Sequence, residues 1–334
     1  MNLDQLRQCF PDETACRNFL ESVIWSRGRR CPHCGHSKSY HLQGESTLPG
    51  TYECADCKKQ FRVTTKTPMH GTKLSLWKWI MAMYSIINSS KGISSVYLAR
   101  WIGVSQPTAW KIGHAIREMM APDGQLNGTV ELDEKYVRGK PRREKDFRHK
   151  RGHGTDKQQV LIAVERHGSV RSIPVDNKKI TTLAPLVTSL VSRKADLMTD
   201  ELPSYRSIGS WYQTHSQVNH SQGQYANGAT HTNTAESFGA LLERAKFGVF
   251  HSLSRKHLHR YLREIGFRWN HSERKEHITK TGKKKVVMIP LPITMMLVSL
   301  LSCCAGKQLR RTKNSGIRSL SPEIMFNSVP YFCS

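Results

Sequence analysis

The stretch TVELDEKYV, residues 129–137, alternates side chains in the way that a β-strand does. Such a strand sends Glu131 and Asp133 to one face and Glu134 to the other. The next segments, QQVLIAVE and SVRSIPVD, are rich in β-branched residues and are separated by the turn-like RHG. The sequence therefore predicts a sheet whose first strand carries three acidic residues.

Downstream of these strands, helical and strand patterns alternate. TTLAPLVTSLV (181–191) predicts a helix, and DLMTDE (196–201) predicts a short buried strand that ends at Asp200. Residues 234–270 then predict one long helical region or a broken pair of helices. Strands followed by helix, strand and helix are typical of the α/β class.

Upstream, two helical stretches are predicted over about 74–88 and 94–120, the second broken at Gly103. Ser105 can cap the helix after the break. Gln106, Thr108 and Lys111 then face outward near its start, where the recognition helix of a helix-turn-helix meets DNA bases. A plain helical hairpin has the same apolar spacing. The positions expected to face the core are Val96, Leu98, Ala99, Ile102, Ala109, Ile112 and Ile116.

Two CxxC pairs lie near the N-terminus, Cys31-Pro-His-Cys34 and Cys54-Ala-Asp-Cys57. Each pair makes a tight turn that directs two thiolates to one point, and two such turns close a tetrahedral four-sulfur site that suits Zn²⁺. The spacing between the pairs is typical of zinc-binding ribbons. Because thiolates fill all four positions, we expect one structural zinc; unliganded cysteines or a redox dithiol are the alternative.

The composition predicts a polyanionic partner. The chain has 334 residues, with 51 Lys and Arg against 26 Asp and Glu, and a formal net charge of +25. Nucleic acid is the first candidate for such a chain. Acidic residues stand where a secretory segment would be apolar, and Pro290 and Pro292 interrupt the most apolar stretch. We therefore expect a protein of the cell interior, with no membrane partner.

Two basic stretches, 138–151 and 273–285, are candidates for phosphate contact. The first holds Arg142, Arg143 and Lys145 and lies between two predicted strands, so we expect a charged loop there. A run of charge alone is equally typical of a solvated loop, but the net charge of +25 and the nearby candidate DNA-binding site favour phosphate contact.

Acidic residues at the ends of buried strands are the candidates for chemistry. Asp133 and Asp200 both have such positions, where a charge is costly unless a partner compensates it. Mg²⁺ or Mn²⁺, which take oxygen ligands, would pair with both. Glu236 supplies a third carboxylate, although Asn233-x-x-Glu236 also resembles a capping box. From Glu236 alone the cap is the better interpretation; the two aspartates favour a two-ion site for phosphodiester chemistry.

Several stretches together resemble the zinc-ribbon insertion-sequence transposases with an ISXO-like DDE domain. The resemblance runs from the ribbon to about Asn270, with a weaker similarity in LLSCCAGKQL near 300–309. It is carried by ELDEKYVRGKPR, TDELPSY, the VNHSQG…HTNTAESF stretch and HSLSRKHLHRYLREIGFRWN.

This resemblance implies a ribonuclease-H-like catalytic core with a mixed sheet, preceded by a zinc ribbon and a helix-turn-helix. It implies a DDE triad at Asp133, Asp200 and Glu236, in which Asp133 bridges two Mg²⁺ (or Mn²⁺) ions and each of the other two flanks one. It also implies metal-dependent cleavage of transposon ends and joining of the 3′-hydroxyl to target DNA. His231 and Asn233 could touch the scissile phosphate or the water, and a capped, solvated turn explains them equally well.

The organisation expected from these patterns has five parts. They are a helical lead over 1–25, the zinc ribbon over 26–70, a helical region with the helix-turn-helix over 71–122, the DDE domain over 129–270, and a basic C-terminal extension over 271–334.

The leading interpretation is a DNA transposase that binds the terminal inverted repeats of its mobile element. Its expected partners are double-stranded DNA, both element ends and target, and further copies of the chain on that DNA, in a cytoplasmic, nucleoid-associated setting. The alternatives are a catalytically weakened or domesticated DNA-binding regulator, or a nuclease on the same core.

One departure from the family bears on this choice. Relatives carry Lys or Arg seven residues after the triad glutamate, where this chain has Glu243, followed by Arg244. A carboxylate there would repel DNA unless Arg244 reaches around to it. The sequence leaves open a weakened enzyme or a Glu243 that supports a metal or a basic neighbour.

Overall fold

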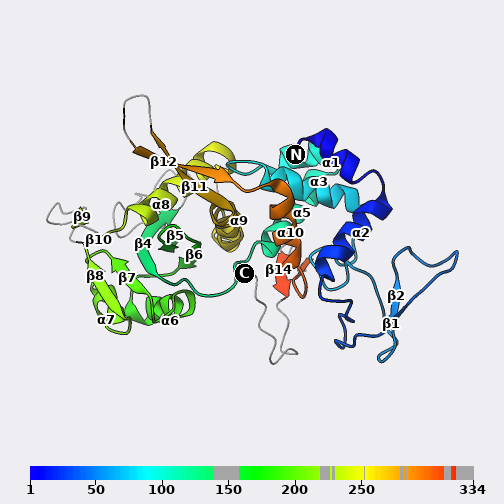
Figure 1. The fold of residues 1–334 in the computed structure, drawn as a ribbon, viewed down its shortest axis with the longest axis horizontal. Coiled ribbons are helices and arrows are strands. Elements are labelled where there is room, and N and C mark those ends of the chain that lie inside the picture. Colours follow the sequence, from blue (N-terminus) through cyan, green and yellow to red (C-terminus); the bar gives the residue numbers. More distant parts are fainter. Residues whose placement is uncertain are drawn as a thin grey trace, which may run out of the picture. The chain divides into compact units, whose positions relative to one another are not determined.

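The computed structural model describes residues 1–137, 158–218, 226–227, 230–251, 253–278, 282, 284–311 and 317–320. The first basic stretch (138–151), with Arg142, Arg143 and Lys145, lies wholly outside these residues. The described chain forms two compact units, each drawn as a ribbon in Figure 1. Pro122–Pro290 make the core unit, and residues 1–121 with the described residues from 291 onward make the terminal unit.

A five-stranded mixed sheet is the centre of the core unit. Its strand order is β6-β5-β4-β7-β8, with β4, β5 and β6 antiparallel and β4, β7 and β8 parallel. This confirms the predicted α/β class with a mixed sheet. The strands are β4 (Thr129–Val137), β5 (Gln158–Glu165), β6 (Val170–Val175), β7 (Asp196–Thr199) and β8 (Thr214–Gln217).

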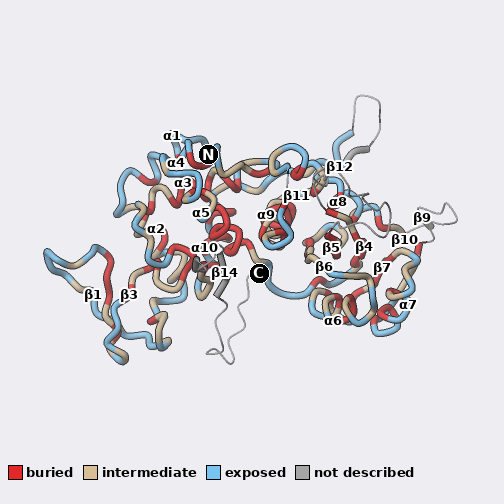
Figure 2. Tube along the Cα trace, turned by 180° about the vertical axis from the view of Figure 1, so that it is seen from behind, coloured by how far each residue is buried: buried red, intermediate tan, exposed pale blue. Residues whose placement is uncertain are grey.

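Helices cover both faces of this sheet, and buried positions run along β4 and β5 (Figure 2). On one face Leu132 and Leu161 pack in a cluster with α6 (Ile180–Leu190) and α7 (Pro203–Gly209). On the other face Ile162 packs in a cluster with α8 (Asn233–Ala245) and α9 (Leu258–Asn270). The predicted helical region over 234–270 is thus a broken pair, interrupted by a π-helical turn (Lys246–Phe250) and a 3₁₀ turn (Arg255–His257).

The second basic stretch forms a two-stranded ribbon rather than a loop. β11 (Ser272–Ile278) pairs antiparallel with β12 (Lys284–Pro290). Arg274 ties the base of the ribbon to the core unit, because its guanidinium donates to the Gly168 carbonyl (3.1 Å) and lies 4.8 Å from the centre of the Trp269 ring. A second, very short hairpin, β9 (Ala226–Asn227) and β10 (Thr230–His231), precedes α8.

The terminal unit is helical apart from two small sheets. α10 packs against α2 and α3. The expected C-terminal extension (271–334) is therefore divided: its residues up to Pro290 belong to the core unit, and its described residues from Leu291 onward belong to the terminal unit. Among the described residues, no helix has the length and apolarity needed to cross a membrane. The elements are α1 (Leu3–Cys9), α2 (Glu13–Ile24), β1 (Ser39–His41), β2 (Tyr52–Cys54), β3 (Gln60–Phe61), α3 (Leu76–Ile87), α4 (Ser95–Ile102), α5 (Gln106–Met119), α10 (Ile293–Ser302), β13 (Gln308–Arg311) and β14 (Ile317–Leu320).

Candidate functional site

Strand β4 sends its acidic residues to opposite faces, as the alternation predicts. Asp133 stands opposite Ile162 of β5, which packs in the cluster under α8. Glu134 stands opposite Leu161, which packs in the cluster under α6 and α7. Because directly paired residues share a face, Asp133 lies on the α8 side of the sheet.

Parallel pairing brings Asp200 beside Asp133. Glu131 of β4 is in register with Met198 of β7, and two residues further along each strand are Asp133 and Asp200. Asp200 follows the last residue of β7, and its Oδ1 accepts a hydrogen bond from the Leu202 backbone N–H (3.0 Å). The expectation that both aspartates lie at strand ends is correct for Asp200 alone, because Asp133 lies in the middle of β4. The parallel register of β4 and β7 nevertheless brings the two aspartates together.

Helix α8 brings Glu236 to the same place. Glu236 lies in the first turn of α8 and is exposed. Burial, the largest cause, together with the negative charges of Glu134, Asp200 and Glu236 raises the pKa of Asp133 to about 6. Asp200 and Glu236 are thus near enough for their charges to act on Asp133, an effect that bound cations would relieve.

The donor set fits hard divalent cations, which prefer carboxylate oxygens. Within the described parts of the chain, three or more candidate ligand atoms come within 4.8 Å of one another only at the four cysteines. The carboxylate oxygens of Asp133, Asp200 and Glu236 therefore do not all lie within 4.8 Å of one another, as the ligands of a single fully coordinated ion would. Two ions about 4 Å apart would need such a spread.

The N-terminus of α8 differs from the expected capping box. The N-cap residue is Thr232, and its side chain makes no capping hydrogen bond. The carboxylate of Glu131 takes that place: its Oε2 accepts from the backbone N–H groups of Thr234 (2.7 Å) and Ala235 (3.0 Å). The alternative interpretation of Glu236, as the glutamate of a capping box, therefore does not apply.

Glu131 also holds two basic groups. Its Oε1 lies 2.7 Å from the Nε of Arg166 and 3.2 Å from the Nδ1 of His231. A second nitrogen of Arg166 donates to the His231 carbonyl (2.9 Å). His231 thus contacts a fully buried carboxylate, whereas Asn233 is exposed at the start of α8.

Sequence reasoning missed Glu131. The alternation placed it on the same face as Asp133, which was a usable signal of burial. Its partners Thr234 and Ala235 lie more than one hundred residues away in the chain, so no local pattern shows that they meet.

The opposite face of β4 carries a second buried network. Glu134 pairs with Lys178 (2.6 Å) and accepts a hydrogen bond from the hydroxyl of Tyr205 on α7. Burial and the charge of Glu134 raise the pKa of Tyr205, so its hydroxyl keeps its proton and donates. This network holds α7 against the sheet directly behind Asp133 and Asp200.

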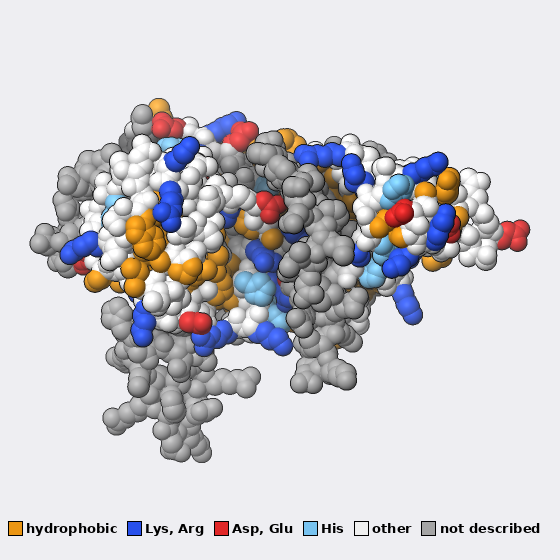
Figure 3. All heavy atoms as spheres, turned by 90° about the horizontal axis from the view of Figure 1, so that it is seen from below, with side chains coloured by type: hydrophobic (Ala, Val, Ile, Leu, Met, Phe, Trp, Pro, Cys, Tyr) orange, Lys and Arg blue, Asp and Glu red, His pale blue; other side chains and the backbone are white. Residues whose placement is uncertain are grey.

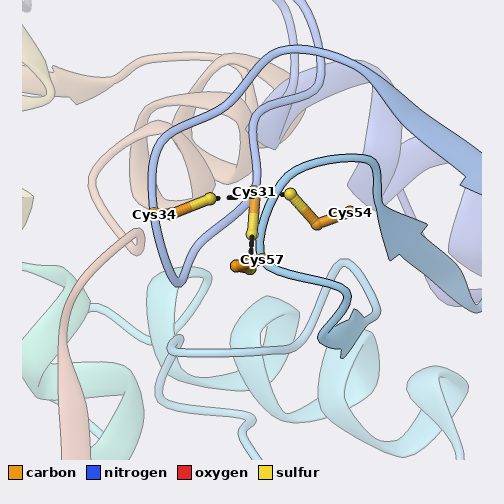
Figure 4. A group of neighbouring side chains, drawn as sticks. All are labelled: Cys31, Cys34, Cys54 and Cys57. Carbon is orange, nitrogen blue, oxygen red and sulfur yellow. Dashed lines mark hydrogen bonds between the residues drawn. The ribbon is translucent and has the colours of Figure 1, made fainter.

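The four predicted zinc ligands converge in the terminal unit. Their sulfur atoms lie within 4.8 Å of one another and point to one centre (Figure 4). The Cys31–Cys57 and Cys34–Cys54 sulfur pairs are 3.7 and 3.5 Å apart. A tetrahedron with Zn–S bonds of about 2.3 Å has edges of about 3.8 Å. The four cysteines therefore fit a structural zinc ion.

Both CxxC turns have the same backbone geometry. The N–H of Gly35 donates to the carbonyl of Cys31 (2.8 Å), and the N–H of Lys58 donates to the carbonyl of Cys54 (3.2 Å). Gly35 and Lys58 both have positive φ, +82° and +54°. These turns direct the sulfurs inward. A small aromatic core with ring centres 5.4–6.2 Å apart supports them, formed by Trp25, Tyr52 and Phe61.

The predicted helix-turn-helix residues lie on α4 and α5, which are joined at Gly103. Gly103 ends α4 in the left-handed region (φ +61°), a conformation that favours glycine. Gln106 and Lys111 are exposed, and Thr108 is half-buried, near the start of α5. The helix pair has the expected order and turn, and its binding to DNA stays a prediction.

One expectation for this helix pair is correct only in part, and another is wrong. Ser105 is the N-cap residue of α5, but its hydroxyl contacts the Thr108 hydroxyl (2.9 Å) and caps no backbone N–H. Val96 is 49% exposed, because α4 packs through Leu98, Ala99 and Ile102 instead. Val96 contributes to an open hollow of about 640 Å³, whose lining also includes Arg100 and Gln106.

Glu243 has a basic neighbour. Its carboxylate lies 3.4 Å from the Nζ of Lys246, whose side chain is only 7% exposed. Arg244, the predicted DNA contact beside it, is exposed. The pair supports the second of the two interpretations of Glu243, namely that it holds a basic residue in place.

The change Glu243→Lys is therefore expected to lower the free energy of unfolding by roughly 1–3 kcal/mol, because it leaves the buried Lys246 unpaired beside a second cation. Glu243→Gln, which adds no positive charge, should cost less. Urea unfolding of the two variants measures this. If Glu243→Lys is as stable as the wild type or more stable, the Glu243–Lys246 pair has no structural role. The interpretation of the chain as a weakened enzyme would then be favoured.

Comparison with known proteins gives separate matches for the part of the chain with the acidic site and for the part with the four cysteines. Residues 125–270 match the ISXO2-like transposase domain, and residues 11–60 match the transposase zinc-ribbon domain. The first range contains β4, β7 and α8, and the second contains all four cysteines. The chain is also 29% identical over 296 residues to an uncharacterized protein in the transposable element ISH50 of Halobacterium salinarum. That alignment covers 84% of this chain and 96% of the relative.

Proposed function

The chain belongs to the zinc-ribbon insertion-sequence transposases with an ISXO2-like domain, and we propose that it binds its element's terminal inverted repeats and catalyses metal-dependent cleavage and strand transfer. The observation that carries the catalytic part is the acidic site. Asp133 and Asp200 are adjacent across parallel strands, and both Asp200 and Glu236 raise the pKa of Asp133. The strand order β6-β5-β4-β7-β8 supports assignment of the core unit as ribonuclease-H-like.

The three carboxylates have distinct roles in this proposal. Asp133, on the central strand β4, would be the ligand shared by two Mg²⁺ or Mn²⁺ ions, and Asp200 and Glu236 would each hold one of them. Such ions, when bound, activate the attacking oxygen and stabilise the leaving oxygen of a phosphodiester. The residues themselves would supply rigid oxygen ligands, because Asp133 lies within the central strand β4, Asp200 directly follows β7, and Glu236 lies in the first turn of α8.

We propose that the terminal unit recognises the element's ends. Gln106, Thr108 and Lys111 are assigned to base and phosphate contacts at the start of α5. The zinc ribbon and the basic residues Arg142, Arg143, Lys145 and Arg244 are assigned to DNA contacts as well. Figure 3 shows exposed Lys and Arg side chains together with some Asp and Glu, and the chain's excess of 51 Lys and Arg over 26 Asp and Glu supports phosphate contact. Assembly of several copies on paired ends belongs to the same proposal.

A reaction with two labelled element ends, a target plasmid and Mg²⁺ tests this function. We expect a 3′-hydroxyl at each element end and its joining to the target. Cutting without joining would point to a nuclease on the same core, and binding without cutting would point to a regulator. Either outcome would overturn the proposed transposition chemistry.

The affinity for element ends is expected to fall by roughly 10³ between 50 and 200 mM salt, given at least about six phosphate contacts. Replacing Arg142, Arg143 and Lys145 together by alanine should flatten this dependence without changing the preference for end sequence, because phosphate contacts carry no sequence information. Fluorescence anisotropy with end DNA and scrambled DNA over a salt series measures both. An unchanged slope would assign the 138–151 stretch to solvation alone.

A further inference from the structure

We infer that Glu131 is a positioning residue that holds the first turn of α8, and through it Glu236, against the strand that carries Asp133. The inference rests on the proposed function, because it concerns the arrangement of the triad. It assigns a role to a side chain that no sequence pattern singled out. Glu131 does not act on the substrate itself.

The contacts of Glu131 lie at the point where Glu236 is held. The backbone N–H of Ala235, the residue directly before Glu236, donates to the Glu131 carboxylate (3.0 Å), and the N–H of Thr234 donates at 2.7 Å. These are donors of the first helical turn that an N-cap side chain ordinarily satisfies, and Thr232 does not satisfy them. The start of α8 is therefore anchored to the sheet and not to its own cap.

The anchor lies on the same strand as the bridging aspartate. Glu131 and Asp133 are two residues apart on one face of β4, a separation of about 7 Å along the strand. A single rigid strand thus carries Asp133 and also holds the turn that carries Glu236. Movement of α8 relative to Asp133 requires breaking the Glu131 contacts.

Glu131 has no oxygen available for a metal ion. Oε2 accepts the two backbone N–H groups of α8. Oε1 accepts from the Nε of Arg166 (2.7 Å) and the hydroxyl of Thr234 (3.0 Å), and lies 3.2 Å from the Nδ1 of His231. A carboxylate offers about four acceptor sites. Its role is therefore to orient a ligand, not to be one.

Arg166 extends the anchor to the chain entering α8. It compensates the charge of the fully buried Glu131, which would otherwise be strongly destabilising. The same guanidinium donates to the carbonyl of His231 (2.9 Å), immediately before the N-cap residue Thr232. Glu131 and Arg166 thus hold both sides of the start of α8.

The test compares Mn²⁺ binding and end cleavage for the full-length, zinc-loaded protein. Glu131→Gln is expected to weaken Mn²⁺ binding and slow cleavage by about 10- to 100-fold, the usual effect of losing a group that orients a metal ligand. End binding should be unchanged. Leu183→Ala, a cavity variant on the opposite face of the sheet, is the stability control and should retain Mn²⁺ affinity at temperatures below its unfolding.

A double variant separates positioning from a general loss of structure. If Glu131 acts through Glu236, then Glu131→Gln/Glu236→Gln binds Mn²⁺ no more weakly than Glu236→Gln alone. Additive losses would overturn the inference, as would unchanged Mn²⁺ affinity in a folded Glu131→Gln. If Glu131→Gln does not fold, Arg166→Lys replaces it: this change keeps the charge and loses the link to His231. It should weaken Mn²⁺ binding several-fold, and an unchanged affinity would contradict the role.

The two proposals fail differently. If Glu236→Gln leaves Mn²⁺ binding and cleavage unchanged, the proposed catalytic site is wrong. If Glu236→Gln abolishes cleavage and Glu131→Gln changes neither measurement, only the positioning role is wrong.

Discussion

Replacing Glu236 by glutamine is expected to lower cleavage at the element's ends by at least about 10³-fold, which corresponds to roughly 4 kcal/mol of barrier. The amide presents a neutral oxygen where a divalent cation requires a charged ligand. Glu236 is exposed in the first turn of α8 and does not cap the helix, so the change should leave the fold intact. Asp133→Asn and Asp200→Asn should have effects of the same size.

The measurement is single-turnover cleavage of a labelled end, with binding to the same DNA measured in parallel. Ser237→Ala is the matched control, because it removes an exposed hydroxyl next to Glu236 that donates to the carbonyl of Asn233 (2.8 Å). We expect near-normal cleavage from this control. If Glu236→Gln cleaves at a rate near that of the wild type, Glu236 is not part of the triad.

Loss of zinc is the second large effect. Cys31→Ser is expected to release the ion and unfold the ribbon, because structural zinc contributes on the order of 10 kcal/mol to such small units. Cys31 is buried and its sulfur lies 3.7 Å from that of Cys57. Specific binding of element ends should fall sharply, while the thermal transition of the core unit should remain.

Zinc stoichiometry by elemental analysis and calorimetric unfolding together measure this effect. Cys9→Ser is the matched control, since Cys9 is an exposed cysteine outside the cluster. It should retain one zinc per chain and normal end binding. A wild-type protein purified without stoichiometric zinc, or a Cys31→Ser variant with full end affinity, would contradict the role of the ribbon.

Much of this site could be predicted because its signals are local. The alternation of TVELDEKYV predicts which face Asp133 takes, and CxxC spacing alone indicates the four-sulfur site. The register of β4 and β7 then explains why Asp133 and Asp200 meet. The capping role of Glu131 could not be predicted. The local pattern indicated a cap formed by Asn233 and Glu236 themselves, whereas Glu131, which accepts the hydrogen bonds, lies on a strand distant in the sequence. For Val96, amphipathic spacing alone did not define which stripe of α4 faces the core.

The return of α10 to the terminal unit had no sequence signal either. The stretch around Met296 is apolar, but nothing local shows that it packs against α2 and α3. The basic run after Asn270 likewise gave no sign of the β11–β12 ribbon, because Lys and Glu are uncommon in strands.

The central claim is that Asp133, Asp200 and Glu236 form one two-ion site, and a Mn²⁺ titration followed by electron paramagnetic resonance tests it most directly. The full-length, zinc-loaded protein on end DNA is expected to bind two Mn²⁺ ions per catalytic unit. Asp133→Asn should lose both ions, because it is assigned as the bridge, whereas Asp200→Asn and Glu236→Gln should each lose one. An Asp133→Asn variant that still binds two Mn²⁺ ions with wild-type affinity would contradict the claim.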